Sequence, residues 1–513
     1  MSYWRHGDRA DKIYLGIVLA TLGLGETPKV RLRAQLTLFD ATNLVVGATI
    51  GADIYVISSF GAQYLGPASL LAWVAAGIIA IAIALCFALC EALLPRTGGP
   101  YAYAKRAWGP FAGFIVGWSL WLAEWTSLAV FPIAFVRYVM FFLPGLDSTH
   151  QAAIKVLYVA FLVVTNVAGA KAAGRMNDVL TFVKIAPLIL FIGIGSVYMM
   201  SNPSTVVSNL SPFVPYGFAN AGAALVLIFW AYAGFEISSI PAAEVEHPRK
   251  TLPLSIMIGM SIVTVFYLAV NVVLFAVRPW YQLALDTTPL ASAAGALLGT
   301  NSALALVGGG IVGAGALVSV AGADESGMLG TSRLGYALAV DGLFPRFFAE
   351  LHPRYKTPYL GIIVQAVTAL VASMVADLSM LISTSVFLLA IAYTATSLSI
   401  FPLRKESKTP ESGLSGSWLI PVLGVISSIY LITQCSIVQI AAGLALIAIG
   451  IPIYIWYSPK KEMKELREAF LSRDSVLQRT YQQEHRFLAN VLRHIKRLYR
   501  RITRREHVWV VTE

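Results

Sequence analysis

The chain of 513 residues is 57% hydrophobic and 13% charged, with a mean hydropathy of +0.71 and a net charge of +11. Soluble proteins carry about a quarter charged residues, so this composition excludes an ordinary soluble domain. The charge is also uneven, because residues 458–513 alone hold fourteen Lys and Arg. Long uncharged stretches with a charged end indicate a protein that crosses a membrane many times.

Residues 1–36 precede the first long apolar block, and we expect them to form a cytosolic N-terminal segment. Residues 13–24 within it are apolar but short, and no small-residue cleavage site follows. We therefore interpret them as an interfacial or poorly ordered leader and not as a signal peptide. Twelve apolar blocks between turn signals follow. They predict spans at 38–60, 66–94, 111–142, 152–170, 178–199, 219–241, 252–277, 302–323, 358–375, 378–402, 418–436 and 438–457.

The Lys and Arg residues predict the orientation. With twelve spans, the N-terminus, the tail and the five loops between them on the same side hold all but four of the 38 Lys and Arg. The exceptions are Arg137, Lys155, Lys184 and Arg278. Because cytosolic loops carry the excess of positive charge, both termini are predicted to be cytosolic. The expected location is the cytoplasmic membrane.

The tail, residues 458–513, places apolar residues at helical spacing among its many basic ones. A basic amphipathic helix next to a membrane typically lies on anionic lipid headgroups, so membrane lipids are the expected partner. A regulatory or oligomer contact is the alternative, and the oligomeric state stays open. Tethering to a membrane argues against nucleic-acid binding.

Two predicted spans are interrupted by glycine-marked segments, 47–53 in the first and 230–236 in the sixth. Interrupted helices at matching places in two halves are typical of inverted-repeat transporters with a binding site at the bilayer midplane. An unwound segment frees amide N–H groups for a carboxylate and carbonyl groups for an ammonium or a cation. An α-amino acid carries both charges on one carbon. The alternative is that these glycines only allow close helix packing.

The chain resembles the amino acid–polyamine–organocation superfamily of transporters over residues 36–457. The resemblance rests on five motifs: Gly47-x-x-Ile50-Gly51-Ala52-x-Ile54, Pro95-x-Thr97-Gly98-Gly99-Pro100-Tyr101-x-Tyr103, Gly234-Phe235-Glu236, Glu244-Val245-Glu246-x-Pro248-Arg249-Lys250-Thr251-x-Pro253, and Ser332-Arg333-Leu334-x-Tyr336-Ala337-x-Ala339-x-Asp341-Gly342-x-x-Pro345, the last similar to the family's helix 8–9 loop. It implies the leucine-transporter fold, an all-α membrane architecture with helices 1–5 and 6–10 as inverted repeats and helices 11–12 peripheral. It also implies alternating access, in which helices 1, 2, 6 and 7 rock against a scaffold.

This resemblance implies a binding site for the substrate at the two interruptions. The substrate carboxylate would meet amides near Gly51 and Ala52, and its ammonium would meet carbonyls of both interrupted helices. An aromatic residue at Trp230 would cover the substrate, as in arginine/agmatine antiporters of the superfamily; an ordinary packing tryptophan is the alternative. The expected binding residues are Thr49, Ile50, Gly51, Ala52, Asp53, Trp230, Ala231, Ala233 and Gly234.

Coupling and gating are expected of Lys184, Glu236, Glu124 and Trp230. A lysine at the position of Lys184 stands, in many family members, where sodium-coupled relatives bind sodium. Desolvation lowers a lysine pKa, so it would act by reversible protonation or as a fixed charge. A lysine that snorkels to the cytosolic surface is the alternative. Glu124 is either a coupling acid or a structural acid hydrogen-bonded across helices.

Two features depart from the family pattern. Asp53 stands where the family has a small residue, and its carboxylate would repel that of a substrate. It would pair with Lys184, bind a cation, or accept the amine of a decarboxylated substrate. Asp324 and Glu325 stand where small residues and an asparagine are common. Because they lie near the predicted cytosolic end of the eighth span, we expect solvated vestibule residues, with proton relays as the alternative.

The sequence thus predicts a secondary active transporter of amino acids, proton-coupled or exchanging without sodium. An amine or polyamine carrier and a non-transporting nutrient receptor are the alternatives. The sequence contains no phosphate loop, zinc-helix motif or metal-ligand spacing, so no enzyme activity, cofactor or metal is expected. The predicted units are 1–36, a ten-helix core at 37–403, helices 11 and 12 at 404–457, and the tail at 458–513.

Overall fold

The computed structural model describes residues 37–51, 53–94, 99–168, 170–236, 248–299, 303–406 and 417–457, and for 170–184 it describes the backbone alone. Throughout these residues the regular structure is helical, with no strand. The predicted all-α class is therefore confirmed. The leader and the basic tail predicted at 13–24 and 458–513 lie outside the described residues.

The helices of the first half of the chain are α2 (Leu38–Thr49), α3 (Asp53–Leu65), η1 (Gly66–Ala68), α4 (Ser69–Leu93), α5 (Gly99–Trp108), α6 (Pro110–Phe142), α7 (Ser148–Ala168), α8 (Ala170–Ser201), α9 (Pro203–Asn209) and α10 (Ala221–Trp230). Those of the second half are α11 (Pro248–Val277), α12 (Trp280–Leu283), α13 (Pro289–Leu297), α14 (Ala303–Val340), η2 (Arg346–Ala349), α15 (Tyr359–Val375), α16 (Leu378–Glu406), α17 (Leu419–Gln434) and α18 (Ile437–Tyr457). Most of these coincide with predicted spans to within a few residues.

Seven helical segments of the described chain are long and apolar enough to cross a membrane, and an eighth results if the bent pair Ile185–Ser201 and Pro203–Asn209 is one span. Four shorter apolar helices accompany them, namely Leu38–Gly47, Ala221–Trp230, Tyr359–Val375 and Leu419–Gln434. The protein is therefore a multi-pass helical membrane protein. The number of twelve spans and the inverted repeat stay predictions.

The eighth predicted span differs from the structure at its end. The prediction ends this span at residue 323, whereas α14 continues to Val340. Residues 332–340, the first part of the motif assigned to the loop between helices 8 and 9, are therefore helical. The expectation of solvated residues at Asp324 and Glu325 was also wrong, because only 1% and 4% of their surfaces are exposed. The helix continues because the segment contains no proline and its small residues allow neighbouring helices to pack closely.

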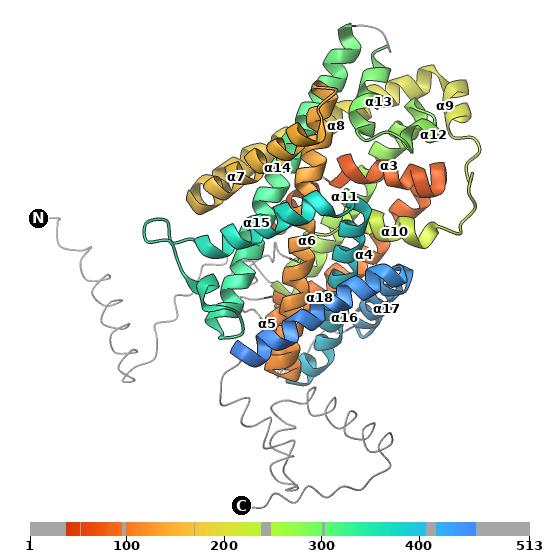
Figure 1. Cartoon of the computed structure of the whole chain (residues 1–513). Helices are drawn as coiled ribbons and strands as arrows, with labels where there is room; N and C mark the ends of the chain where they lie inside the picture. Colours follow the sequence, from red (N-terminus) through yellow and green to blue (C-terminus); the bar gives the residue numbers. More distant parts are fainter. Residues whose placement is uncertain are drawn as a thin grey trace, which may run out of the picture.

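Helix α6 runs through the middle of the molecule (Figure 1) and packs against α5, α14, α15 and α16. Helix α4 packs against α11, α16 and α17, and α2 packs against α11. Several contacts depend on glycine: a Cβ at Gly424 would lie 2.7 Å from the Ser397 Oγ atom, and one at Gly313 would lie 3.1 Å from the Phe142 ring. Close packing of this kind replaces the hydrophobic driving force that lipid does not provide.

Candidate functional site

The first interruption separates α2 from α3. Helix α2 ends at Thr49, Ile50 has extended backbone at φ −73° and ψ 100°, and α3 begins at Asp53. A Cβ on Gly51 would lie 3.2 Å from the Asp53 carboxylate, so a larger residue would crowd the turn. The predicted interruption of the first helix is thereby confirmed. It leaves amide groups at the start of α3 and carbonyl groups at the end of α2 without intrahelical partners.

Two buried tyrosines hold the two ends of this interruption. The Tyr267 hydroxyl of α11 donates to the Thr49 carbonyl at 2.9 Å, and the Tyr138 hydroxyl of α6 donates to the Tyr55 carbonyl at 2.8 Å. The Thr49 hydroxyl donates to the Val45 carbonyl one turn earlier at 2.9 Å. The non-helical backbone is therefore fixed in place by neighbouring helices, as irregular backbone at membrane depth must be.

The second interruption begins where α10 ends. Trp230 is its last residue, Ala231 and Tyr232 form a turn, and Ala233 and Gly234 are not helical. Gly234 has φ +118°, a conformation that residues with a Cβ rarely adopt. Its N–H group donates to the Glu236 Oε2 atom at 2.9 Å. The predicted interruption at 230–236 is therefore confirmed, and the rest of the sixth predicted span, 237–241, lies outside the described residues.

The Trp230 side chain is 3% exposed and joins three helices. Its indole N–H donates to the Ser127 Oγ atom of α6 at 3.0 Å. Ser127 and Ser385 of α16 share a hydrogen bond of 2.9 Å between their hydroxyl oxygens, and Ser385 donates to the Ala123 carbonyl at 2.9 Å. The Phe131 ring packs against the indole with ring centres 5.8 Å apart. This network fixes the orientation of the indole ring.

Three buried acids meet near the two interruptions. Asp53 and Glu124 are each 9% exposed, and Glu236 is 3% exposed. The Glu124 carboxyl lies within electrostatic range of both Glu236 and Asp53. The fold thus brings together three acids that lie far apart in the sequence. Charges inside a membrane are costly, so they concentrate at functional positions.

Two predicted site residues cannot be placed in this cluster. Lys184 belongs to α8, but its side chain is outside the described part, as is Ala52. Thr49, Ile50 and Gly51 are buried in the first interruption. The described residues contain no group of three His, Cys, Asp or Glu that could hold a metal ion. The sequence analysis did not identify Tyr138, Tyr267, Ser127 and Ser385 as site residues. The only feature in the sequence that could have indicated them is a hydroxyl group inside an apolar span.

A second polar cluster lies where α5 meets the end of α14. The Lys105 ammonium lies 2.7 Å from the Asp341 Oδ2 atom, and the Tyr101 hydroxyl donates to the same oxygen. Partial burial acts to raise the pKa of Asp341, but the hydrogen bonds from Lys105 and Tyr101 outweigh it and hold the pKa below its ordinary value. Both side chains of the ion pair are 38% exposed, so it contributes little to stability.

Interrupted helices around a buried polar centre, within a helical membrane protein, define the class of membrane transporters. Comparison with known families then gives a particular one. The profile described as amino acid permease matches residues 36–456, and the chain belongs to this family. Its members are transporters and not enzymes.

Individual relatives resemble the chain over most of its length. The branched-chain amino acid permease BcaP of Bacillus subtilis (strain 168) is 28% identical over 84% of this chain and 94% of the relative. The methylthioribose transporter of the same organism is 28% identical over 84% and 95% of the two chains. Its serine/threonine exchanger SteT is 27% identical over 84% and 98%. These relatives differ in their substrates, so the likeness indicates amino acid transport without giving the substrate.

Proposed function

We propose that the protein is a secondary active transporter that carries amino acids across the cytoplasmic membrane by alternating access, without sodium. The observation that carries the proposal is the interruption at Gly51, whose two ends are held by Tyr267 and Tyr138. Relatives named as permeases and exchangers of amino acids support it.

The expected chemistry follows from the backbone groups that have no partner within their own helix. Amides at the start of α3 lie at the positive end of a helix dipole and would bind the substrate carboxylate. Carbonyls at the end of α2 and near Ala231 would accept hydrogen bonds from its ammonium group. The expected contacts are Thr49, Ile50, Gly51, Ala52 and Asp53 on one side and Trp230, Ala231, Ala233 and Gly234 on the other.

Coupling is proposed to involve Glu124 and Glu236 together with Lys184. Buried acids that share one electrostatic environment cannot all be charged at low cost, so one of them would carry a proton. Protons are therefore the proposed coupling ion, either in symport or in exchange. Lys184→Ala should reduce coupled uptake more than substrate binding. Equal loss of both would place Lys184 in the binding site.

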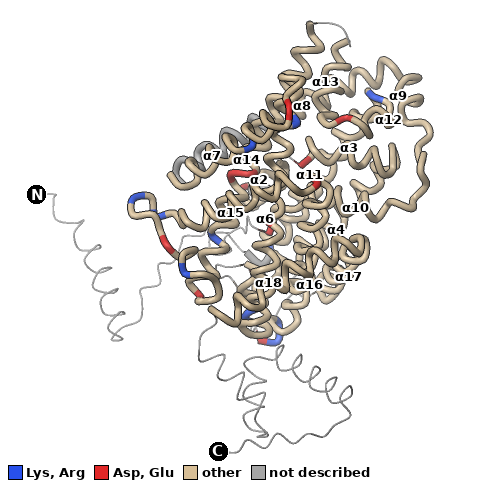
Figure 2. The backbone as a smooth tube through the Cα atoms, in the orientation of Figure 1, with Lys and Arg blue, Asp and Glu red and all other residues tan. Residues whose placement is uncertain are grey.

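The proposed orientation has both termini in the cytosol. Blue segments lie along the lower and left margins of the molecule, with a few others near α8 and α9 (Figure 2). Lys105, Arg354 and Arg404 belong to the side of the sequence that is predicted to be cytosolic. This distribution follows the excess of positive charge in cytosolic loops. The ten-helix core at 37–403, the peripheral helices at 404–457 and contact of the tail with lipids belong to the same proposal.

The test is uptake into proteoliposomes of a panel of amino acids and amines. Each compound is given an imposed proton gradient, a sodium gradient, or neither. Accumulation of an amino acid under a proton gradient alone, or exchange that ignores sodium, is the expected result. If no compound of the panel shows uptake or exchange, the proposal is wrong.

A carrier of amines is the second candidate, and the buried carboxylate of Asp53 at the first interruption favours it. A carboxylate there would repel the substrate carboxylate and attract an amine. Competition discriminates, because an amine carrier prefers compounds without a carboxylate. Asp53→Gly should shift preference towards substrates with a free carboxylate, and unchanged selectivity would reduce Asp53 to a structural role.

A further inference from the structure

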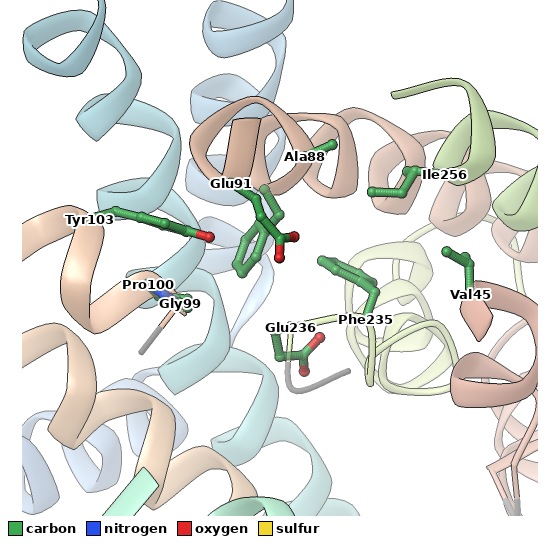
Figure 3. Close-up of a pocket in the computed structure, with 10 residues that line it drawn as sticks. Val45, Ala88, Glu91, Gly99, Pro100, Tyr103, Phe235, Glu236 and Ile256 are labelled. Carbon is green, nitrogen blue, oxygen red and sulfur yellow. The ribbon is translucent and has the colours of Figure 1, made fainter. Parts of the chain in front are cut away.

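A small cavity lies beside the second interruption, between α2, α4, α5 and α11. It is lined by Val45, Phe87, Glu91, Tyr103, Phe235 and Glu236, among others (Figure 3). About 20 Å³ of it is open to the centre of a water-sized sphere. A single water needs about 10–15 Å³ by this measure, so the cavity holds one small polar group and not a whole amino acid.

Two carboxylates point into this space. Glu91 comes from the end of α4 and Glu236 from the segment after α10, and their carboxylates are directed towards each other (Figure 3). The Glu236 Oε2 atom accepts the Gly234 N–H, whereas its buried Oε1 atom has no hydrogen-bond partner among the described residues. A buried polar atom without a partner is costly, so an additional donor in the cavity would stabilise this arrangement.

Aromatic rings form part of the remaining walls. Phe87 meets Phe235 edge to face, with ring centres 5.4 Å apart, and Phe235 stacks on Tyr393 at 5.6 Å. Carboxylates combined with aromatic rings attract cations, through charge and through the negative faces of the rings. A primary ammonium group supplies donors, a positive charge and about the size of a water molecule.

We propose that this cavity is a subsite for a primary ammonium group, either on the side chain of a substrate or on a small amine. The proposal rests on the transport function proposed above and adds a subsite beside the one expected at Gly51. A substrate with a second amino group would engage Glu91 and Glu236 while it enters or leaves the central site. Substrates without that group would pass without this contact.

The first test compares lysine with norleucine, which has the same carbon chain without the side-chain ammonium. Binding to the purified full-length protein in detergent is measured by calorimetry. The wild-type protein should bind lysine more tightly, and Glu91→Gln should weaken lysine binding at least about tenfold, because a hydrogen bond to a charged group contributes more than the roughly 1.4 kcal/mol that a factor of ten represents. Norleucine binding should change less than twofold. Glu406→Gln, an exposed acid at the end of α16, is the matched control and should alter neither.

Equal binding of lysine and norleucine by the wild-type protein would overturn the proposal, and this comparison needs no variant to fold. Equal losses for both ligands in Glu91→Gln would also overturn it. Protection from heat by methylammonium chloride, compared with sodium chloride, provides a second measurement that requires no amino acid. If methylammonium protects wild type but not Glu91→Gln while no amino acid is transported, the subsite stands and the transport proposal fails. If neither salt protects more than the other, the cavity holds only water.

Discussion

The hydrogen bond between Trp230 and Ser127 is open to a direct energetic test. It joins α10 to α6 at 3.0 Å, in a region where neither residue is appreciably exposed. Trp230→Phe removes the donor and leaves the bond between Ser127 and Ser385 intact. Ser127→Ala removes the acceptor and leaves a buried indole N–H without a partner, which costs about 1–3 kcal/mol. We therefore expect Ser127→Ala to destabilise the protein more than Trp230→Phe.

The double variant separates this bond from the other effects of each substitution. Hydrogen bonds between membrane helices contribute about 0.6 kcal/mol on average and at most about 1.7 kcal/mol, which corresponds to roughly a three- to eighteen-fold change in an equilibrium constant. The coupling free energy between Trp230→Phe and Ser127→Ala should lie in this range. It is obtained from denaturant titrations of the four proteins in detergent micelles. Coupling below about 0.3 kcal/mol, within the usual additivity of independent sites, would refute the reasoning.

Three further predictions concern other parts of the fold. Tyr267→Phe should weaken substrate binding about fivefold, because the Thr49 carbonyl loses one hydrogen bond of about 1 kcal/mol; binding calorimetry measures this. Gly424→Ala should destabilise the protein by about 1–3 kcal/mol through overpacking, whereas Gly193→Ala, with no neighbouring atom within 4 Å, should have little effect on unfolding in denaturant. The ion pair of Asp341 should make a small contribution to stability at neutral pH that is lost as the pH falls below the ordinary value of 3.8, so Asp341→Asn should lower thermal stability slightly at pH 7 and by progressively less as the pH is lowered below 3.8.

Each of these predictions has a contrary outcome. Unchanged affinity in Tyr267→Phe would mean that the first interruption keeps its shape without the tyrosine. Equal stability losses in Gly424→Ala and Gly193→Ala would mean that the close approach of α17 to α16 at Gly424 relaxes without cost. A stability difference between wild type and Asp341→Asn that does not shrink as the pH is lowered below 3.8 would assign the effect to packing and not to charge.

The positions of most long apolar helices and of the first interruption could be predicted from the sequence. Apolar run length determines whether a helix can cross a bilayer, and the glycines around Ile50 mark the place where α2 ends. Membership in a transporter family was likewise predictable, because its motifs are contiguous in the sequence. The ends of helices were predicted less accurately, since α14 continues 17 residues past the predicted end at residue 323.

The contacts that shape the site could not be predicted in the same way. Tyr267 reaches Thr49 across 218 positions of sequence, and Trp230 reaches Ser127 across 103. No local pattern distinguishes these hydroxyl groups from others in apolar spans. The burial of Asp324 was missed for a related reason, because a charged residue in a sequence gives no information about which neighbouring helices cover it.

The length of α14 determines how far a small rotation between helices at the membrane centre would displace helix ends at the membrane surface. Its 38 residues extend about 57 Å at 1.5 Å per residue, more than the about 40–45 Å of a bilayer with its headgroups. In the proposed mechanism α14, the eighth predicted span, belongs to the scaffold against which helices 1, 2, 6 and 7 rock, and a relative rotation of about 10° between the two would displace their ends by about 5 Å over such a length. A spin label placed next to Asp341 is therefore positioned to report that tilt as a change in distance. The distance between this label and a second label on a moving helix can be measured spectroscopically in different states of the transport cycle.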